Sequence, residues 1–257
     1  MSDEPKYTLK LKIWKKFEGI IWRIETDEGL GHVAIETRVP NSKEVNFSVF
    51  NFKTGEPLLE EIRTENGWWW NMDRIHQNRL FLHGYLSENT PEHKGICAID
   101  VETGKTSWEN FQLTLEDISD EGLVVYNPLL QPRKFSVISP TDGVHLRSGV
   151  SEYKSVERNI TYPELVSDLA LFPSYLPKNI AGPVSHLKYY NTDIWSYHTE
   201  DQGFFSQEIL ILKEEEIVLH DILTSGIQKL NPESFFIVQN HLFYLKGGYR
   251  EIVTYLL

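Results

Sequence analysis

One short turn recurs three times in this sequence, each time between two apolar runs. The turns are Thr54-Gly55, Thr103-Gly104 and Thr141-Asp142-Gly143, and their glycines are 49 and 39 residues apart. Glycine suits a tight hairpin turn because it adopts positive φ without steric cost. A repeat of about 40 to 50 residues is typical of a four-stranded sheet that occurs several times in one fold. The chain is therefore predicted to be a series of similar antiparallel sheets.

Two further pairs of segments recur between these glycine turns. The run DEGLGHVAIE (27–36) resembles DEGLVVYNPL (120–129), and QNRLFLHGY (77–85) resembles QNHLFYLKG (239–247). In each segment a two-residue turn, Glu-Gly or Gln-Asn, precedes an apolar strand. Interleaved with the glycine turns, these segments divide the chain into units of four strands.

The units predict an all-β fold, a five-bladed β-propeller that forms a single domain over residues 1–257. The last unit has no fourth strand, and 8–17 is a strand with no unit of its own. We therefore expect the N-terminal strand to pair with 250–257 and to close the last blade, which removes open sheet edges. The predicted blades span approximately 19–66, 67–110, 111–160, 161–226, and 227–257 together with 8–17.

Charge and composition exclude several classes of function. The net charge of −12 repels phosphate groups, so neither nucleic acid nor an anionic membrane is an expected partner. The sequence has no secretory signal and no apolar run long enough to cross a membrane. Cys97 is the only cysteine and cannot form an internal disulfide. Together these features favour a cytoplasmic location, and they leave the oligomeric state open.

The segment AIDVETGKTSWE (98–109) resembles the quinoprotein (PQQ-type) propeller repeat, in which an apolar strand leads into Asp-x-x-Thr-Gly and a strand bearing tryptophan. The match is strong in the second unit, partial in the first and third, and absent in the last two. The resemblance implies a propeller and not quinone binding, because the sequence shows no metal-ligand cluster. The whole chain also resembles a propeller-like family of Bacteroidota of unknown function.

Candidate site residues lie on the first strands of the units, because first strands line the central channel of a propeller. Carboxylates converging at a channel mouth could catalyse glycoside hydrolysis, or could simply pair with Arg23 and Arg74. Two tryptophans of the triplet 68–70 share one face of a strand and could stack a sugar, or could fill the space between blades. The candidate ligand-binding residues are Trp22, Glu25, Asp27, Trp70, Asp73, Arg74, Asp117 and Asp168.

No metal site or cofactor is expected from the motifs. The nine histidines are scattered and none has the HExxH spacing, and the chain has no GxSxG motif. The leading hypothesis is a binding or scaffold propeller with a protein or peptide partner on one face. A glycoside hydrolase and a carbohydrate-binding propeller are the alternatives. The proline-containing insertion 172–186 is a further candidate for a lid or a partner contact.

Overall fold

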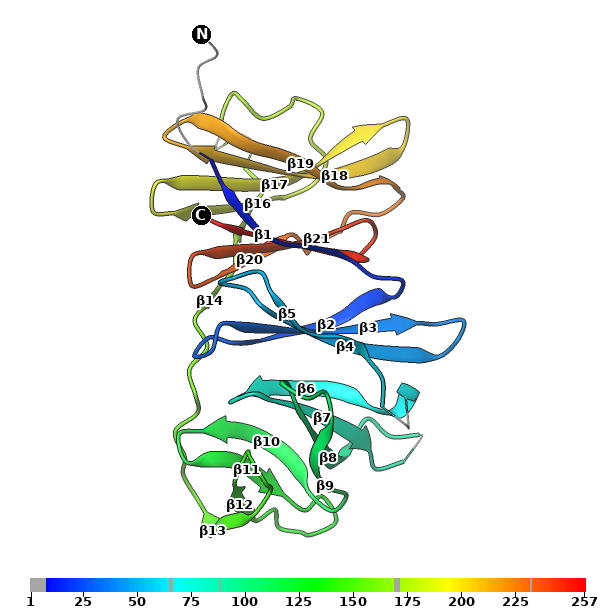
Figure 1. Cartoon of the computed structure of the whole chain (residues 1–257). Coiled ribbons are helices and arrows are strands. Elements are labelled where there is room, and N and C mark those ends of the chain that lie inside the picture. The colour runs from blue at the N-terminus through cyan, green and yellow to red at the C-terminus, as the bar shows by residue number, and fades with distance from the viewer. Residues whose placement is uncertain (1–7, 65–66, 88, 169–171, 232) are drawn as a thin grey trace. The chain divides into compact units, whose positions relative to one another are not determined.

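The computed structural model describes residues 8–64, 67–87, 89–168, 172–231 and 233–257, and their regular structure is almost entirely β (Figure 1). One 3-10 turn, η1 (Gly67–Trp69), is the exception among these residues. In the same residues, no helix has the length and apolar character that crossing a membrane would require. The chain divides into two compact units, 18–158 and 1–17 together with 159–257, which are described separately below.

The 18–158 unit contains three antiparallel sheets, and each is formed by four consecutive strands. The first sheet is β2 (Ile20–Asp27), β3 (His32–Val39), β4 (Glu44–Asn51) and β5 (Pro57–Ile62). The second is β6 (Asn71–His76), β7 (Arg79–Tyr85), β8 (His93–Asp100) and β9 (Thr106–Asn110). The third is β10 (Thr114–Ser119), β11 (Gly122–Tyr126), β12 (Phe135–Ile138) and β13 (His145–Val150).

The other unit contains two sheets of five strands each. In order across the fourth sheet lie β15 (Glu164–Val166), β16 (Val184–Tyr189), β17 (Thr192–Asp201), β18 (Phe204–Lys213) and β19 (Glu216–Ile227). Across the fifth sheet lie β1 (Lys10–Lys16), β22 (Glu251–Leu256), β21 (His241–Lys246), β20 (Phe235–Val238) and β14 (Ile160–Thr161). The predicted pairing of the N-terminal and C-terminal strands is confirmed, since β1 is antiparallel to β22 with Trp14 opposite Val253.

The three glycine turns adopt one geometry, as the repeat predicted. Gly55, Gly104 and Gly143 have φ of 90°, 68° and 69°. Each donates its backbone N–H to the carbonyl four residues earlier, at 2.7, 2.8 and 3.0 Å. That earlier residue is an Asn, an Asp or a Ser, and its side-chain oxygen accepts a further backbone N–H within the turn. The repeated signal is thus the glycine together with a polar residue four positions before it.

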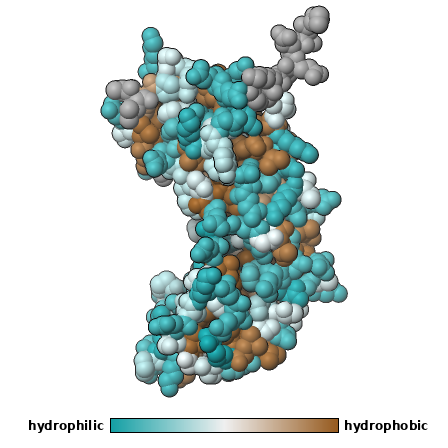
Figure 2. Space-filling model, turned by 90° about the vertical axis from the view of Figure 1, so that its left-hand side faces the viewer, coloured by the Kyte–Doolittle hydropathy of each residue, from teal (hydrophilic) through white to brown (hydrophobic). Residues whose placement is uncertain are grey.

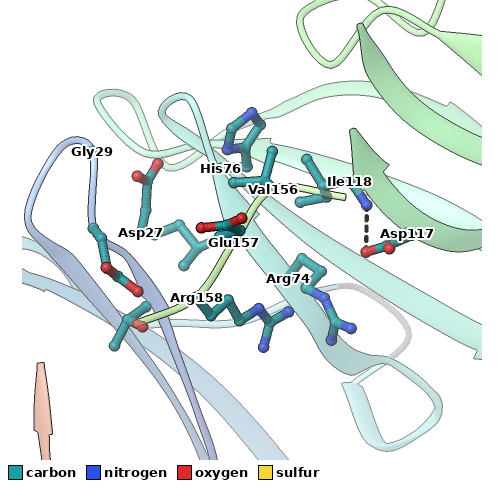
Figure 3. A pocket seen from close by; sticks show the side chains of 12 residues that line it. Asp27, Gly29, Arg74, His76, Asp117, Ile118, Val156, Glu157 and Arg158 are labelled. Atoms are coloured by element: carbon teal, nitrogen blue, oxygen red, sulfur yellow. Dashed lines mark hydrogen bonds between the residues drawn. The ribbon is translucent and has the colours of Figure 1, made fainter. Parts of the chain in front are cut away.

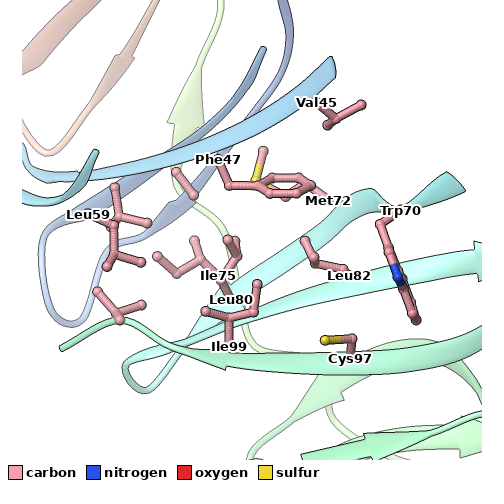
Figure 4. Packing of buried hydrophobic residues seen from close by; sticks show 13 residues of the cluster. Val45, Phe47, Leu59, Trp70, Met72, Ile75, Leu80, Leu82, Cys97 and Ile99 are labelled. Carbon is pink, nitrogen blue, oxygen red and sulfur yellow. The ribbon is translucent and has the colours of Figure 1, made fainter. Parts of the chain in front are cut away.

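Buried aliphatic and aromatic side chains pack neighbouring sheets together within each unit. Between the first and second sheets, Phe47, Val49 and Leu59 meet Met72 and Leu80 (Figure 4). A second cluster joins the second and third sheets, and a third cluster joins the fourth and fifth sheets. These clusters form because alternate residues of each strand point to one face of the sheet.

The first strand of each sheet in the 18–158 unit carries one extra residue. The register shifts at Trp22 in β2, at Asp73 in β6 and at Glu116 in β10, relative to the second strand of each sheet. Such a bulge bends its strand and redirects the side chain of the extra residue. Strict alternation therefore fails at these three positions, and two of them, Trp22 and Asp73, are candidate site residues.

The tryptophan triplet does not lie on a strand, contrary to the expectation. Its first two members, Trp68 and Trp69, belong to the 3-10 turn η1, and β6 begins only at Asn71. Trp70 is 6% exposed and belongs to the core between the first and second sheets, 6.3 Å from Phe111 between ring centroids. Trp68 packs against the same core cluster. The two side chains therefore help to fill the space between the first and second sheets, which was the alternative to stacking a sugar.

The first strand predicted for the fourth unit, 164–172, is shorter in the structure. β15 ends at Val166 and is the edge strand of the sheet, paired with β16. Residues 169–171 of this prediction lie outside the described residues. The strand equivalent to β2 or β6 is β16, which a turn at Tyr190 joins to β17. Most of the insertion 172–186 therefore precedes the repeated part of this sheet, and its last three residues belong to β16. Its first part and Asp168 follow β15 outside any strand.

Candidate functional site

A pocket of about 150 Å³ lies where the first strands of three sheets end (Figure 3). The strands β2, β6 and β10 supply three of its walls, and the segment after β13 supplies the fourth. All of these elements belong to the 18–158 unit. The lining residues are Thr26, Asp27, Glu28, Gly29, Arg74, Ile75, His76, Asp117, Ile118, Val156, Glu157 and Arg158.

The fourth wall is a segment that runs beside the free edge of β10. Val156 donates its backbone N–H to the carbonyl of Ile118 at 2.9 Å, and Ser155 donates its hydroxyl to the Asp117 carboxylate. The backbone N–H of Asp120 donates to the carbonyl of Lys154 at 3.3 Å. These bonds satisfy part of the exposed strand edge and hold the wall in place.

Asp27 joins two sheets at the pocket through hydrogen bonds to backbone groups. Its Oδ1 accepts the N–H of Leu30 at 3.2 Å, within the turn after β2. Its Oδ2 accepts the N–H of Gln77 at 2.9 Å, in the turn after β6. This carboxylate is 8% exposed, so its position is fixed by the fold.

Glu25 lies next to the pocket and is surrounded by three arginines. Its carboxylate is 2.9 Å from Arg23, 3.0 Å from Arg158 and 3.6 Å from Arg74. The side chain of Glu25 is only 7% exposed, and a buried charge of this kind is tolerated when it is paired. One interpretation of the sequence was that a first-strand carboxylate simply pairs with Arg23 and Arg74. Glu25 is paired in this way.

Asp73 lies next to Arg74 in the sequence, but it does not line the pocket. Burial opposes its ionisation, yet the nearby His83 and the positive charges of Arg74 and Arg23 outweigh that effect, so the pKa of Asp73 lies below its usual value. The carboxylate Oδ2 is 3.6 Å from Nδ1 of His83. The ring of His83 in turn stacks on that of His93, with ring centroids 3.5 Å apart.

Trp22 lies at the surface beside a second arginine. It is 65% exposed, and the guanidinium of Arg38 lies 5.0 Å from its ring centroid. The same guanidinium lies 5.1 Å from the ring centroid of Trp68 and is paired with the buried Glu36 at 2.6 Å. Such cation–π contacts fix the arginine between two indole rings.

Of the eight sequence-predicted site residues, the pocket brings three together, Asp27, Arg74 and Asp117. Glu25 is connected to them through its arginines. Trp70 is in the core instead, and Asp168 is an exposed residue of the other unit. Trp22 and Asp73 lie on the same strands but outside the pocket lining.

Sequence reasoning did not identify His76, Glu157 and Arg158, which also line the pocket. His76 directly precedes a Gln-Asn turn and could have been found from that position. Glu157 and Arg158 lie in a segment with no strand of its own, and the repeat gives it no assigned place. The charged residues of this segment were the signal from which it could have been recognised as part of a site.

Figure 2 shows the hydropathy of the residues on one face of the molecule. That face is mostly hydrophilic, and its hydrophobic residues form separate small groups (Figure 2). Single exposed apolar residues are ordinary on soluble domains. The pocket is the feature of the 18–158 unit that is considered below for binding of a partner.

Comparison with known proteins gives one family and a set of distant solved structures. The family described as "Domain of unknown function (DUF4905)" matches residues 26–108, less than half of the chain. This segment extends from the end of β2 into β9, and it includes four of the candidate residues, Asp27, Trp70, Asp73 and Arg74. No protein of curated function matches the sequence.

The similar solved structures include one propeller domain and two peptidases. The β-propeller domain of the Trilobed protease from Pyrococcus furiosus is 14% identical, with a TM-score of 0.34 over 94% of this chain and 70% of that one. The Pyrococcus horikoshii acylaminoacyl peptidase is 12% identical, with a TM-score of 0.31 over 88% of this chain and 35% of that one. An acylaminoacyl peptidase in complex with Z-Gly-Gly-Phe-chloromethyl ketone is 13% identical, with a TM-score of 0.32 over 95% and 40%. The chain thus spans less than half the length of either peptidase.

Proposed function

We propose that this chain is a five-bladed β-propeller that binds a polypeptide partner, with one basic side chain of the partner in the pocket. The five similar sheets support the propeller. Three consist of four consecutive strands, and the fifth obtains its outer strand from the N-terminus, as a closing blade requires. The pocket at the ends of β2, β6 and β10 supports the binding role, and its fixed acidic lining is the observation that carries the proposal.

The size of the pocket favours a single side chain over a whole small molecule. Its volume is about 150 Å³, whereas pockets for drug-sized ligands and cofactors measure roughly 300 to 1,000 Å³. A partner that inserts one side chain could contact the surrounding turns with the rest of its backbone. This mode of binding agrees with the charged side chains in the lining.

The charge of the pocket favours a basic side chain. Four carboxylate residues line it, Asp27, Glu28, Asp117 and Glu157, against two guanidinium groups, those of Arg74 and Arg158. Both arginines are already close to the buried carboxylate of Glu25. The chain as a whole carries a net charge of −12, which attracts cationic partners over a longer range.

The walls are held before any ligand arrives, which lowers the entropic cost of binding. Hydrogen bonds fix Asp27 from two sheets and Asp117 from the neighbouring backbone and Ser155. Figure 3 shows Glu157 among these groups, between Asp27 and the two arginines. A lysine or arginine side chain entering here would meet carboxylates that need little rearrangement.

The alternative functions have weaker support. A glycoside hydrolase needs a carboxylic acid with a raised pKa, whereas the pKa of Asp73 is lowered. A sugar-binding site built on the tryptophan triplet needs two rings on one accessible face, whereas Trp70 is buried in the core. These observations favour binding of a polypeptide over both alternatives.

The proposal can be tested with three capped tripeptides, Ac-Gly-Lys-Gly-NH₂, Ac-Gly-Arg-Gly-NH₂ and Ac-Gly-Glu-Gly-NH₂, titrated into ¹⁵N-labelled protein. The basic peptides are expected to shift the backbone amide signals of residues 26–29, 74–76, 117–118 and 156–158, with weak saturable binding. The acidic peptide should leave them unchanged. Equal shifts for all three peptides, or shifts located elsewhere, would contradict the proposal.

A pair of variants sharpens the test. Glu157→Gln removes one carboxylate of the pocket wall, so it should weaken binding of the basic peptides. Glu216→Gln removes an exposed carboxylate in the other unit and should leave binding unchanged. If both variants bind as the parent does, the acidic lining of the pocket is not the determinant.

A further inference from the structure

Three potential metal ligands meet on neighbouring strands of the second sheet. Asp73 is on β6, His83 on β7 and His93 on β8. Their ligand atoms all lie within 4.8 Å of one another. The residues are ten positions apart in each step, a spacing that fits no sequence motif. Strand pairing therefore forms the group, which explains why no sequence motif indicated it.

Two of these ligand atoms are buried without a hydrogen-bond partner among the described residues. They are Oδ2 of Asp73 and Nδ1 of His83. The side chains of Asp73 and His83 are 12% and 3% exposed, and the two atoms are 3.6 Å apart, which is longer than a hydrogen bond. Native structures rarely leave such polar atoms unsatisfied, and a bound cation would give a partner to both.

We propose that Asp73, His83 and His93 form a binding site for a divalent transition-metal ion of the zinc type. Two imidazole nitrogens and one carboxylate oxygen suit zinc, cobalt, nickel or iron, whereas magnesium and calcium prefer oxygen ligands alone. Three protein ligands leave at least one coordination position for water or another molecule. The site is separate from the pocket, since none of the three residues lines it.

The fold positions the ligands through a bulge. Asp73 is the extra residue of β6, between Met72 opposite Leu82 and Arg74 opposite Phe81. Because a bulge redirects its side chain, Asp73 reaches the neighbouring strand and approaches His83. Arg23 and Arg74 also lie near Asp73, and their positive charges repel a metal ion there. Both arginines are paired with the carboxylate of Glu25, which offsets part of that repulsion.

Binding requires His93 to turn. Its ring stacks on that of His83, with the ring centroids 3.5 Å apart and an angle of 13° between the ring planes. The nitrogen lone pairs of the two rings therefore lie in nearly parallel planes and do not point at one common ion. Ligand atoms about 2.1 Å from a tetrahedral ion are about 3.4 Å apart, so atoms that lie within 4.8 Å of one another need to approach by at most about 1.4 Å. His93 is the residue that can move, because it is only half-buried and is the first residue of β8. Its backbone stays fixed, since the Thr114 hydroxyl donates to its carbonyl at 2.7 Å.

The test uses untagged full-length protein that has been treated with EDTA and then dialysed. Zinc chloride is titrated in a calorimeter, and cobalt chloride is titrated while the visible absorption is recorded. We expect one zinc ion per chain, and cobalt bands whose intensity reports a low-coordinate site with nitrogen and oxygen ligands. If the parent protein binds neither zinc nor cobalt in a stoichiometric amount, the proposal is wrong.

Two ligand variants and one matched control assign the site. His93→Ala removes the half-exposed ligand, and Asp73→Asn removes the charged one. Loss of an outer-shell partner typically weakens metal binding by ~10- to 100-fold. Loss of a direct ligand in either variant should weaken zinc binding at least as much. His186→Ala is the control, since His186 is 3.1 Å from Asp193 and stacks on Trp195 but belongs to no group of three possible ligands among the described residues.

The control should bind zinc as the parent does, and circular dichroism should show that all variants are folded. If folded His93→Ala and Asp73→Asn both bind zinc as tightly as the parent, the ion lies elsewhere and the proposal is wrong. Loss of binding in His186→Ala alone would overturn it as well.

Discussion

The indole Nε1 of Trp14 donates a hydrogen bond to Oε2 of Glu251 at 3.0 Å, between residues 237 positions apart. The bond connects β1 to β22 on the outside of the fifth sheet. Trp14 is 64% exposed, so it lies at the surface and not in a core. The buried residues of this segment are Leu9, Ile13 and Phe17. The N-terminal strand is therefore attached through these three side chains and its ladder of backbone hydrogen bonds.

Deletion of residues 1–17 is predicted to destabilise the unit to which β1 belongs. The deletion removes three buried apolar side chains, each of which contributes ~1.5–3 kcal/mol, and it exposes the edge of β22. A loss on the order of 5 kcal/mol is expected, against ~5–15 kcal/mol for a whole domain. Urea denaturation followed by far-UV circular dichroism measures the loss.

A shorter deletion, of residues 1–7, is the matched control for this experiment. It retains Leu9 and the whole of β1 (Lys10–Lys16), so the strand pairing stays complete. The free energy of unfolding should stay near that of the parent. Equal stability of the two truncated proteins would show that β1 contributes little.

Gly143→Ala is predicted to destabilise the protein more than Gly203→Ala. Both glycines have positive φ, of 69° and 83°, so either alanine costs ~1–2 kcal/mol in backbone strain. An added Cβ at Gly143 would also lie 2.9 Å from the ring of Trp108, whereas at Gly203 it would meet no atom within 4 Å. Trp108 cannot easily retreat, because its Nε1 donates to the carbonyl of Pro140 at 3.0 Å.

The difference between the two alanine variants should be about 1–3 kcal/mol, the usual cost of overpacking. Chemical denaturation of both variants in parallel measures it. If the two midpoints coincide, the turn has room for a methyl group and its glycine is needed only for its backbone conformation.

Cys97 is predicted to be unreactive in the folded protein. It is 2% exposed between Ile96 and Ala98 in β8, and burial raises its pKa to about 12. Because the thiolate is the reactive form, a thiol reagent at pH 8 should modify almost none of it. In 6 M guanidinium chloride, where burial is lost, labelling should be complete. Rapid labelling without denaturant would mean that the second sheet opens frequently.

The hairpin turns and strand pairing could be predicted because their determinants are local and repeated. Gly55, Gly104 and Gly143 adopt the predicted conformation, and the unmatched N-terminal strand pairs with the C-terminal one. The same reasoning failed where an element breaks the repeat. In the fourth sheet, an insertion displaced the predicted first strand, and β16 takes that role.

The candidate site was only partly predictable, for a geometric reason. Asp27 and Arg74 could be placed at the ends of first strands by counting residues. The bulges at Trp22 and Asp73 change which way the following side chains point, and no residue type in the sequence identifies them. The wall that contains Glu157 is held by backbone hydrogen bonds to β10, which also leave no trace in the sequence.

Acidification is predicted to destabilise the protein in part through His198. This side chain is 5% exposed, and burial lowers its pKa below the usual 6.5. Its Nε2 accepts the backbone N–H of Asn231 at 3.1 Å, so a proton on that nitrogen would break the bond. The unfolded chain takes up a proton near pH 6.5 while the folded chain does not. The stability is therefore fully present above pH 6.5 and is lost as the pH falls towards the lowered pKa of the folded state, by at most ~1.4 kcal/mol per pH unit.

Urea denaturation of the parent and of His198→Gln at pH 7.5, 6.5 and 5.5 tests this prediction. Glutamine keeps an oxygen that can accept the N–H of Asn231 but has no titrating group, so the loss of stability between pH 7.5 and 5.5 should be smaller in the variant. It should not vanish, since burial also lowers the pKa of His32 and of His76. The exposed His145, changed to glutamine, controls for the effect of a histidine-to-glutamine substitution as such. An unchanged pH dependence in His198→Gln would show that the folded protein accommodates a charged His198.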